Sequence, residues 1–505
     1  MGEQLTDRSL AEREVKLAAA PSFRMPSLDG LADGISSSPR EPERLSTTYL
    51  DTDDLRLARW GVSLRHRVGE GWTVKLPAEG DGALLVRSEL TFAGNARRPP
   101  ARAVDLVRGF IRTAELRPQM SLKTVRRRVE LHDTDGILVA DVVDDEVSVF
   151  EGRRLATRFR ELEVEIGDAT PAGLIDVLVD RFRQAGSGAP DPTPKYIRAL
   201  GPRASQLPEI PTPALSSGAS AGDVVRRAIA ASVVRLIRHD PVVRLDTDPE
   251  GVHQARVATR RLRSDLRTFG SLLDPTWAAE LRDELGWLAS VLGGVRDGDV
   301  MLQRMRGRAA QLPESNARGV ARVLATLEAG RDEAHTALLA TLRSDRYLAL
   351  LDRLVTAAKA PPLLLEADLP AATVLPGLVR RPWRALARRA KALGDIPTVE
   401  DLHDVRIRTK RVRYAAEAVG PLVGRQARAF AAAAAALQEV LGDLNDAVVA
   451  ESWLRDWARR SRSMQGVFAA GELAGLERAA ADRSRTRWRK AWRELASPRL
   501  RTWME

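Results

Sequence analysis

The sequence predicts an α+β protein with two domains, and three observations support this prediction. Residues 1–200 contain short segments in which polar and apolar residues alternate, which is typical of antiparallel strands. Residues 201–221 are rich in Pro, Ser, Ala and Gly, which predicts a linker. From residue 222 to residue 505, apolar residues recur with the period of an α-helix, which predicts an all-α second domain.

Seven segments of the first domain have the two-residue period of a β-strand. They are EREVKLAA (12–19), GVSLRHRV (61–68), GWTVKLPA (71–78), ALLVRSELTF (83–92), SLKTVRRRVEL (121–131), GILVADVV (136–143) and RELEVEI (160–166). The sequence GEG at 69–71 predicts a hairpin turn between two of them. Helical segments are expected at 101–114 and 171–184, so the predicted sheet has flanking helices.

The second domain contains an internal duplication. VHQARVATRRLRSDLRTF at 252–269 is repeated as LHDVRIRTKRVRYAAEAV at 402–419, and LGGVRDGDV at 292–300 is repeated as LGDLNDAVV at 441–449. The repeat predicts a duplicated helical bundle with halves at about 222–355 and 370–500. The second repeat is expected at helix joins, where its acidic residues would cap helices and orient neighbouring arginines, with metal binding as the alternative. These residues are Asp297, Asp299, Asp443 and Asp446.

The first repeat places a row of cations on one face of each helix. At about 100° per residue, the offsets 0, 3, 7, 10 and 14 from each His fall within an arc of about 80°. A solvated face with salt bridges is the alternative, but the first copy has no acid at i±4 on this face. Crowded cations repel each other and a polyanion would relieve this, so the rows predict a phosphate-rich ligand. Their members are His253, Arg256, Arg260, Arg261, Arg263, His403, Arg406, Lys410, Arg411 and Arg413.

The two histidines are expected to donate hydrogen bonds to phosphate. Metal ligation is the alternative, but the arginines around each single His would repel a metal ion. A bound anion would favour the protonated form of His253 and His403.

Charged residues also share one face of nearly every predicted strand. The face could be the solvated side of a half-covered sheet, but carboxylates occupy the terminal strands, whereas Arg and Lys occupy the middle strands. If the sheet closes on itself, its lumen would hold a hard divalent cation and phosphate groups, as in metal-assisted phosphoryl transfer. The residues concerned are Glu12, Glu14, Lys16, Arg65, Arg67, Lys75, Arg87, Arg126, Arg128, Glu161, Glu163 and Glu165.

Composition excludes several other classes. The formal charge is +11, and the chain has no cysteine, which excludes disulfides and thiolate metal sites. The first residues lack the apolar region of a secretory signal, and no apolar stretch is long enough to span a bilayer. We therefore expect a cytoplasmic protein without a membrane partner. No P-loop or dinucleotide-binding glycine motif is present.

These segments resemble two known families. EREVK resembles the ExExK signature of the CYTH superfamily, the triphosphate tunnel metalloenzymes. LRHR, WTVK, VRSE, VRRR, VADV and ELEVE, in this order, resemble its other tunnel strands. The doubled HxxRxxx(R/K)RxR motif resembles the CHAD domain, the conserved histidine α-helical domain, which binds polyphosphate.

The first resemblance implies an N-terminal eight-stranded antiparallel β tunnel. In it, Mg²⁺ or Mn²⁺ would be bound by Glu12, Glu14, Glu163 and Glu165. Triphosphate would be held by Lys16, Arg65, Arg67, Lys75, Arg87, Arg126, Arg128 and Lys195. The resemblance also makes Lys16, Glu161 and Asp141 candidate catalytic residues, the two carboxylates at the metal end or next to the attacking water. Many tunnel enzymes have a lysine in phase with the two arginines of this strand. Here Thr124 occupies that position, and Lys123 lies one residue out of phase with Arg126 and Arg128.

The leading hypothesis is a metal-dependent inorganic triphosphatase with an appended polyphosphate-binding domain. The resemblance to the CHAD domain also leads us to expect an association with polyphosphate granules. A non-catalytic polyphosphate adaptor is one alternative, and adenylate cyclase activity in the tunnel is another. Nucleic acid is not the expected partner, because the cationic rows lack interleaved aromatic residues except Tyr414.

Overall fold

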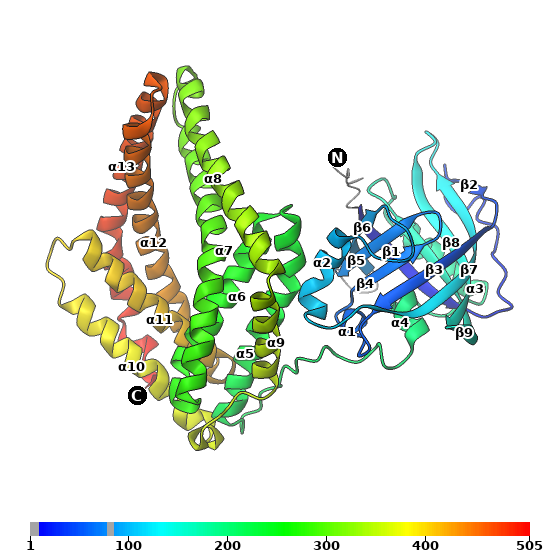
Figure 1. Ribbon diagram of the computed structural model, residues 1–505, viewed down its shortest axis with the longest axis horizontal. Helices are drawn as coiled ribbons and strands as arrows, with labels where there is room; N and C mark the ends of the chain where they lie inside the picture. Colours follow the sequence, from blue (N-terminus) through cyan, green and yellow to red (C-terminus); the bar gives the residue numbers. More distant parts are fainter. Residues whose placement is uncertain (1–9, 78–84, 505) are drawn as a thin grey trace. The chain divides into compact units, whose positions relative to one another are not determined.

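The computed structural model describes the backbone of residues 10–77 and 85–504, and the side chains of residues 13–77 and 88–504 (Figure 1). The chain forms two compact units, which divide between Glu209 and Ile210. The first unit is a curled antiparallel sheet with flanking helices and the second is helical, so the predicted α+β class is confirmed. Glu209 packs on the first unit. The Glu209 carboxylate accepts a hydrogen bond from the Trp60 indole at 3.1 Å and pairs with Arg112 at 2.7 Å.

The first unit consists of nine strands and four short helices among the described residues. The strands are β1 (Leu10–Ala19), β2 (Ser36–Pro39), β3 (Glu43–Asp51), β4 (Ser63–Arg67), β5 (Gly71–Pro77), β6 (Leu85–Phe92), β7 (Arg117–His132), β8 (Leu138–Glu151) and β9 (Arg154–Ile166). The helices are α1 (Arg56–Arg59), α2 (Ala101–Ile111), α3 (Leu174–Gln184) and α4 (Lys195–Leu200).

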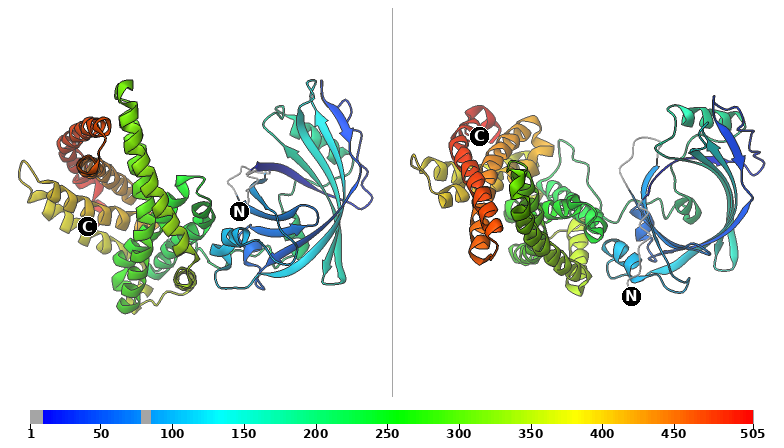
Figure 2. Two further views of the ribbon diagram at one scale, coloured as in Figure 1. Left: turned by 45° about the horizontal axis from the view of Figure 1, so that its top comes forward. Right: turned by 90° about the horizontal axis from the view of Figure 1, so that it is seen from above.

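Eight of these strands close into a ring. Their order is β7-β3-β4-β5-β6-β1-β9-β8, and β8 pairs again with β7, so the implied eight-stranded tunnel is confirmed. Figure 2 shows the ring from its end. The ninth strand, β2, pairs with the part of β7 beyond β3. The sequence prediction missed β2 and β3, because neither segment alternates polar and apolar residues clearly.

Apolar side chains on the two faces of the ring belong to different clusters. On the outer face, Val15, Leu162 and Val164 pack against Leu178 and Phe182 of α3. At one end of the ring, inward-facing residues of β3, β7 and β8 pack against α4. This second cluster contains Tyr49, Leu122, Val147, Tyr196 and Ile197. The charged lumen lies between these apolar regions.

The second unit is built from long helices. They are α5 (Ala221–Leu245), α6 (Pro249–Thr268), α7 (Pro275–Ala309), α8 (Ala317–Arg343), α9 (Asp345–Lys359), α10 (Ala371–Lys391), α11 (Val399–Val423), α12 (Arg425–Arg460) and α13 (Met464–Leu495). A search of the described helices finds none with an apolar stretch long enough to cross a membrane.

The predicted duplication is visible in the pairing of these helices. Helices α5 to α8 correspond to α10 to α13 at an offset of about 150 residues, and α5, α6 and α8 contact α10, α11 and α13 respectively. The starts of the two halves also exchange equivalent backbone bonds. The Ala221 amide donates to Leu369 at 2.9 Å, and the Ala371 amide donates to Ala219 at 3.0 Å. Such reciprocal contacts are those of an approximate two-fold axis.

The prediction that 292–300 and 441–449 form helix joins is wrong. Both segments lie inside continuous helices, α7 and α12. Their glycines provide space instead of a turn. A Cβ on Gly293 would lie 2.7 Å from Nη1 of Arg256, and one on Gly442 would lie 4.0 Å from Nε of Arg406. Gly293 therefore lets Arg256 of the neighbouring cationic row pack against the helix, whereas Arg406 would also leave room for a Cβ at Gly442.

We expect Gly319→Ala to destabilise the helical unit and Gly330→Ala to stabilise it, although both lie in α8. A Cβ at Gly319 would be 2.3 Å from the carbonyl oxygen of Gln465 on α13, and overpacking of this kind costs about 1–3 kcal/mol. A Cβ at Gly330 meets nothing within 4 Å, so replacing this glycine should add about 1 kcal/mol of helix propensity. Urea unfolding followed by far-UV circular dichroism measures both. Equal stabilisation by the two substitutions would contradict the close α8–α13 contact.

Candidate functional site

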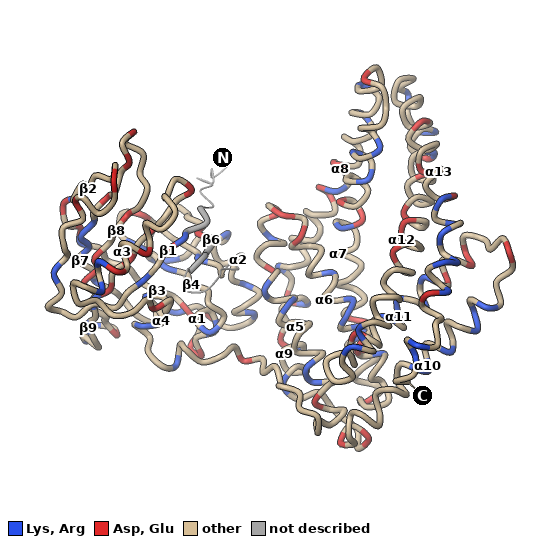
Figure 3. Tube along the Cα trace, turned by 180° about the vertical axis from the view of Figure 1, so that it is seen from behind, with Lys and Arg blue, Asp and Glu red and all other residues tan. Residues whose placement is uncertain are grey.

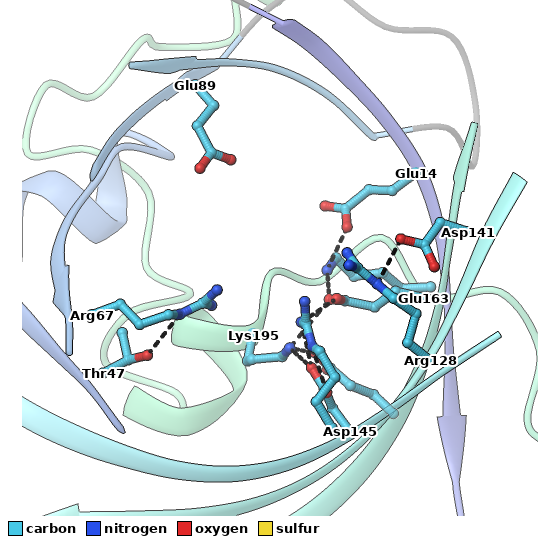
Figure 4. A network of polar contacts seen from close by, with 12 residues as sticks. Glu14, Thr47, Arg67, Glu89, Arg128, Asp141, Asp145, Glu163 and Lys195 are labelled. Carbon is cyan, nitrogen blue, oxygen red and sulfur yellow. Dashed lines mark hydrogen bonds and ion pairs between the residues drawn. The ribbon is translucent and has the colours of Figure 1, made fainter. Parts of the chain in front are cut away.

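The lumen of the ring contains a cavity of about 380 Å³ with an almost entirely polar wall. Figure 4 shows side chains from several strands pointing into the ring. The cavity is lined by Glu14, Lys16, Glu43, Tyr49, Ser63, Arg65, Arg67, Glu70, Lys75, Glu89, Arg126, Arg128, Glu163, Glu165, Lys195 and Tyr196. Ten of the residues predicted from the sequence are therefore brought together: Glu14, Lys16, Arg65, Arg67, Lys75, Arg126, Arg128, Glu163, Glu165 and Lys195.

Three carboxylates meet on one side of this cavity. Glu14 on β1 is the register partner of Glu165 on β9, and Glu163 lies two residues before Glu165 on the same face. Each of the three offers an oxygen within 4.8 Å of the oxygens of the others. Several carboxylate oxygens at this spacing suit a hard divalent cation such as Mg²⁺ or Mn²⁺. The donor set therefore fits the metal that the sequence implies.

Lys16 lies among these carboxylates and stays protonated. Its Nζ is 2.9 Å from Glu14 and also contacts Glu163. Burial alone would lower the pKa of Lys16, but Glu163, Glu14 and then Glu161 outweigh it and raise this pKa well above its ordinary value. Burial would likewise raise the pKa of Glu163, but Lys16, Lys195 and Arg126 hold it well below its ordinary value. Lys16 is thus a cation that is held between two carboxylates of the cavity.

Three further cations of the cavity, Arg65, Arg67 and Lys75, come from β4 and β5. Lys75 is 2.8 Å from Glu89, and Arg65 is 3.4 Å from the same carboxylate. Nε of Arg67 donates to Thr47 at 3.2 Å. Burial, followed by repulsion from Arg65, lowers the pKa of the Arg67 guanidinium. These side chains form a cationic wall that is only partly neutralised by acids.

Behind the cavity wall, a layer of acids holds the cations in place. Asp145 accepts two hydrogen bonds from Arg126, at 2.9 and 2.7 Å, and also pairs with Lys195. Asp141 pairs with Arg128 at 2.8 Å, and Glu161 lies 3.3 Å from Lys195. None of the three acids lines the cavity. The sequence analysis missed Asp145. Because alternate residues of a strand share a face, Asp145 lies on the same face of β8 as Asp141, and this was a usable signal.

The acids of this layer have perturbed pKa values. Burial raises the pKa of Glu161 and of Asp141. Burial acts the same way on Asp145, but Lys195 and Arg126 together lower its pKa below the ordinary value. Asp145 therefore stays ionised and fixes two of the cations that face the cavity.

The other predicted tunnel residues lie elsewhere. Glu12 and Arg87 are register partners on β1 and β6, but their side chains lie outside the described part of the structure. Lys123 is exposed on the outer face over the Phe150 ring, as expected from its phase. The sequence predicted Lys195 of α4 but missed β3 and Tyr196 of α4, where Tyr49 stacks on Tyr196 with 5.8 Å between ring centroids.

In the helical unit, the two cationic rows lie on helices that contact each other, α6 and α11. The Asp248 side chain caps α6 by accepting from the Glu250 amide at 2.8 Å, and Thr398 caps α11 through the Asp401 amide at 3.1 Å. Arg260 and Arg413 lie over the Tyr414 ring, at 5.3 and 5.7 Å from its centroid. The rows therefore meet where the two halves meet.

These rows are short of acceptors. Three buried guanidinium nitrogens have no hydrogen-bond acceptor among the described residues: Nη1 of Arg256, Nε of Arg260 and Nε of Arg406. Arg261 and Arg413 are neutralised by Glu417, and Arg256 reaches the exposed Asp297 at 3.1 Å through Nη2. Buried donors without acceptors are costly, and an anion would satisfy them.

The two histidines have different neighbours. Nδ1 of His403 is 2.9 Å from Oδ1 of Asn445, whereas Arg296 occupies the equivalent position near His253. Burial, followed by repulsion from Arg296, lowers the pKa of His253. His253 is therefore neutral at pH 7 without an anion. Its protonation by a bound anion stays a prediction.

Lys410 is held against like charges, and we expect Lys410→Gln to stabilise the protein at pH 7. Burial, then Arg406, Arg260 and Arg256, lower the pKa of Lys410 from 10.5 to about 8. Because the folded pKa lies below the unfolded one, the protonated amine destabilises the fold below pH 8, and this cost disappears as the pH rises from 8 to 10.5. The substitution should add on the order of 1 kcal/mol at pH 7, after allowance for solvent screening.

Unfolding in urea at pH 7 and pH 10 measures this effect, with Lys359→Gln on the exposed end of α9 as the control. The advantage of Lys410→Gln over wild type should shrink at the higher pH. An advantage that does not change with pH would show that the ammonium group of Lys410 carries no electrostatic cost.

Comparison with known proteins agrees with this architecture. A model of the CYTH domain matches residues 10–196, and a model of the CHAD domain matches residues 227–455. Two proteins of Mycobacterium tuberculosis, the uncharacterized proteins MT2285 (strain CDC 1551 / Oshkosh) and Rv2226 (strain ATCC 25618 / H37Rv), are each 31% identical over 515 residues. Both alignments cover 96% of this chain and 96% of the relative.

Solved structures similar to parts of the chain include PptA from Streptomyces chartreusis, at 24% identity and a TM-score of 0.47, covering 55% of this chain and 100% of that one. The CHAD domain from the plant Ricinus communis has 29% identity and a TM-score of 0.47, and the match covers 57% of this chain and 96% of that one. A putative adenylate cyclase from Bacillus halodurans has 18% identity and a TM-score of 0.25, and the match covers 39% of this chain and 98% of that one. From the two domain matches and the full-length relatives, the chain belongs to the family of proteins that join a CYTH domain to a CHAD domain.

Proposed function

We propose that the tunnel hydrolyses inorganic triphosphate with Mg²⁺ or Mn²⁺, and that the helical unit binds inorganic polyphosphate. One observation carries the first part of this proposal. A single cavity holds three converging carboxylates on one side and the cations Arg65, Arg67 and Lys75 on another. A polyanion with a bound divalent cation is the ligand that satisfies both groups.

The carboxylates Glu14, Glu163 and Glu165 would hold the metal, and we propose Glu12 as a further ligand from its phase on β1. When bound, the metal withdraws charge from the terminal phosphoryl group and lowers the pKa of a nearby water. Lys16 keeps two of these carboxylates, Glu14 and Glu163, close together while the metal is absent.

The cations bind and orient the triphosphate. Arginine suits this role because its planar group donates paired hydrogen bonds to phosphate oxygens and remains charged. Triphosphate would replace Glu89 as the partner of Lys75 and Arg65, and Glu70 as the partner of Arg67. Three acids are positioning residues, because each contacts a cation that lines the cavity without lining the cavity itself. They are Asp145, Asp141 and Glu161.

Hydrolysis of tripolyphosphate, ATP and long-chain polyphosphate in Mg²⁺ tests this proposal. We expect wild-type protein to hydrolyse tripolyphosphate fastest and Glu14→Gln to reduce its rate by at least about a hundredfold, because Glu14 offers an oxygen to the metal. Glu89→Gln is the matched control. It also removes one carboxylate from the cavity, but this one pairs with Lys75 and Arg65, so hydrolysis should persist.

Binding without turnover of any of the three compounds would favour a polyphosphate adaptor. Conversion of ATP to a cyclic product, with tripolyphosphate left intact, would favour a cyclase. Equal activity of Glu14→Gln and wild type at limiting metal would reject the metal site.

A separate prediction concerns phosphate binding in the wall of the tunnel. Arg67→Ala should weaken tripolyphosphate binding about 10- to 100-fold, since a hydrogen bond to a charged group contributes about 1.5–3 kcal/mol. Calorimetric titration with tripolyphosphate in Ca²⁺ or without metal measures affinity in the absence of turnover. Arg40→Ala, which removes an exposed arginine paired with Glu130, is the control. An unchanged affinity for Arg67→Ala, with only a lower melting temperature, would make Arg67 structural.

The second part of the proposal rests on the three buried guanidinium nitrogens without acceptors in the α6 and α11 rows. Phosphate oxygens would accept their hydrogen bonds and relieve the repulsion which, together with the larger effect of burial, lowers the pKa of Lys410 to about 8.

The duplication supplies a matched pair of substitutions for this binding. We expect Gly293→Ala to weaken long-chain polyphosphate binding by up to about tenfold, because the new methyl group would displace the Arg256 guanidinium, 2.7 Å away. The equivalent Gly442→Ala leaves 4.0 Å to Arg406 and should bind normally. Both should be slightly more stable than wild type, because alanine favours the helix. Anisotropy of labelled polyphosphate measures the affinities, and equal affinities would show that Arg256 does not contact the chain.

A further inference from the structure

Helix α10 carries a third row of cations, separate from those on α6 and α11. At about 100° and 1.5 Å per residue, the row covers an arc of about 100° and a length of about 16 Å. It consists of Arg380, Arg381, Arg384, Arg388 and Lys391. The opposite side of α10 is buried through Leu375, Val379 and Leu386. Figure 3 shows basic positions recurring along this helix.

The α10 row has no acidic partner. None of its five members makes an ion pair with another residue of the described structure, and four of them are exposed. Arg389 lies on the other side of α10 and pairs with Asp401 at 2.5 Å and Asp404 at 2.8 Å. The row lines a shallow, open hollow whose wall comes entirely from α10 and also includes Gly377, Trp383 and Ala387. The acids near α10 are therefore used on the opposite side, and the row is left to attract anions.

The two halves differ in the helices that accompany α5 and its counterpart α10. In the first half, α9 packs against α5, and Tyr347 donates to Asp240 at 2.7 Å. In the described part of the second half, α13 is followed only by short 3₁₀ turns, so no helix corresponds to α9. Two buried positions of α5, Ala230 and Pro241, become Arg380 and Lys391 on α10, whereas the counterparts of the other three row members are not buried on α5.

We propose that the α10 row binds linear inorganic polyphosphate as a second surface, in addition to the α6 and α11 rows. The choice of ligand rests on the proposed polyphosphate binding, but the surface is one that the proposed function does not use. A narrow strip of cations matches a thin chain with a charge on every repeat. The strip has no exposed aromatic side chain for base stacking and no apolar side chain for insertion into a bilayer, since Trp383 is only 6% exposed.

Because the chain contains no cysteine, a single introduced thiol can report on this surface. Ala387→Cys places the thiol in the hollow, and Ala372→Cys places it on an exposed position of the same helix outside the row. Thiol-labelling rates of the full chain are measured with and without long-chain polyphosphate. We expect polyphosphate to slow labelling about tenfold in Ala387→Cys and less than about twofold in Ala372→Cys, and high salt to remove this protection.

A charge-matched pair of triple variants tests the contribution of the row to affinity. One combines Arg384→Gln, Arg388→Gln and Lys391→Gln. The control combines Arg318→Gln, Arg322→Gln and Arg483→Gln, which removes three exposed cations from α8 and α13. The first should lower the affinity for long-chain polyphosphate about five- to tenfold and make it less dependent on salt, whereas the control should lower it less than about twofold. Tripolyphosphate hydrolysis and melting temperature should match wild type in both.

The outcomes separate this inference from the proposed function. If polyphosphate binds the chain, Gly293→Ala lowers its affinity, and the labelling rate of Ala387→Cys does not change, only the proposal of the α10 surface is overturned. No polyphosphate binding at all overturns both. Equal losses in the two triple variants reduce the effect to net charge. Protection of Ala387→Cys by duplex DNA or anionic phospholipid vesicles, but not by polyphosphate, assigns the row to another partner.

Discussion

Repulsion between clustered cations is the constraint on which both units depend. In the tunnel, the constraint is met by carboxylates, because Lys16, Arg126 and Lys195 each have an acidic partner in direct contact. In the α6 and α11 rows it is met only in part, and the cost remains in the lowered pKa of Lys410 and in donors without acceptors. The first arrangement satisfies its charges without a ligand, whereas the second leaves buried donors that an anion would satisfy.

Closure of the ring makes the arrangement in the tunnel possible. The acids of β9 reach Lys16 only because β1 pairs with β9, which is far away in the sequence. The acids of β8 reach Arg126 only because β7 pairs with β8. A one-residue slip in either register would turn these charges to the outer face, where α3 packs on apolar residues. The apolar exterior and the charged lumen therefore specify the same register.

Period and phase explain how much could be predicted from the sequence. Alternation identified the strands that carry Glu14, Arg65 and Arg126, and phase correctly placed Lys123 outside. Alternation failed for β3, whose Thr and Tyr residues lack a polar–apolar contrast, so Tyr49 was missed. The glycines at 293 and 442 were misinterpreted as helix joins, because a sequence does not show that an arginine of another helix fills the space beside them. Asp145 was overlooked because its role depends on Lys195, which is 50 residues away.

The duplication gave the helical unit two cationic rows, and later differences made the rows unequal. His253 has Arg296 nearby, where His403 has Asn445, so repulsion from Arg296 adds to burial in lowering the pKa of His253. Glu417 neutralises Arg261 of the first row as well as Arg413 of its own. The first half covers α5 with α9, whereas α10 keeps an open cationic face. An anion that crosses the approximate two-fold axis would therefore meet two different electrostatic environments, and its phosphates should be held unequally in the two halves.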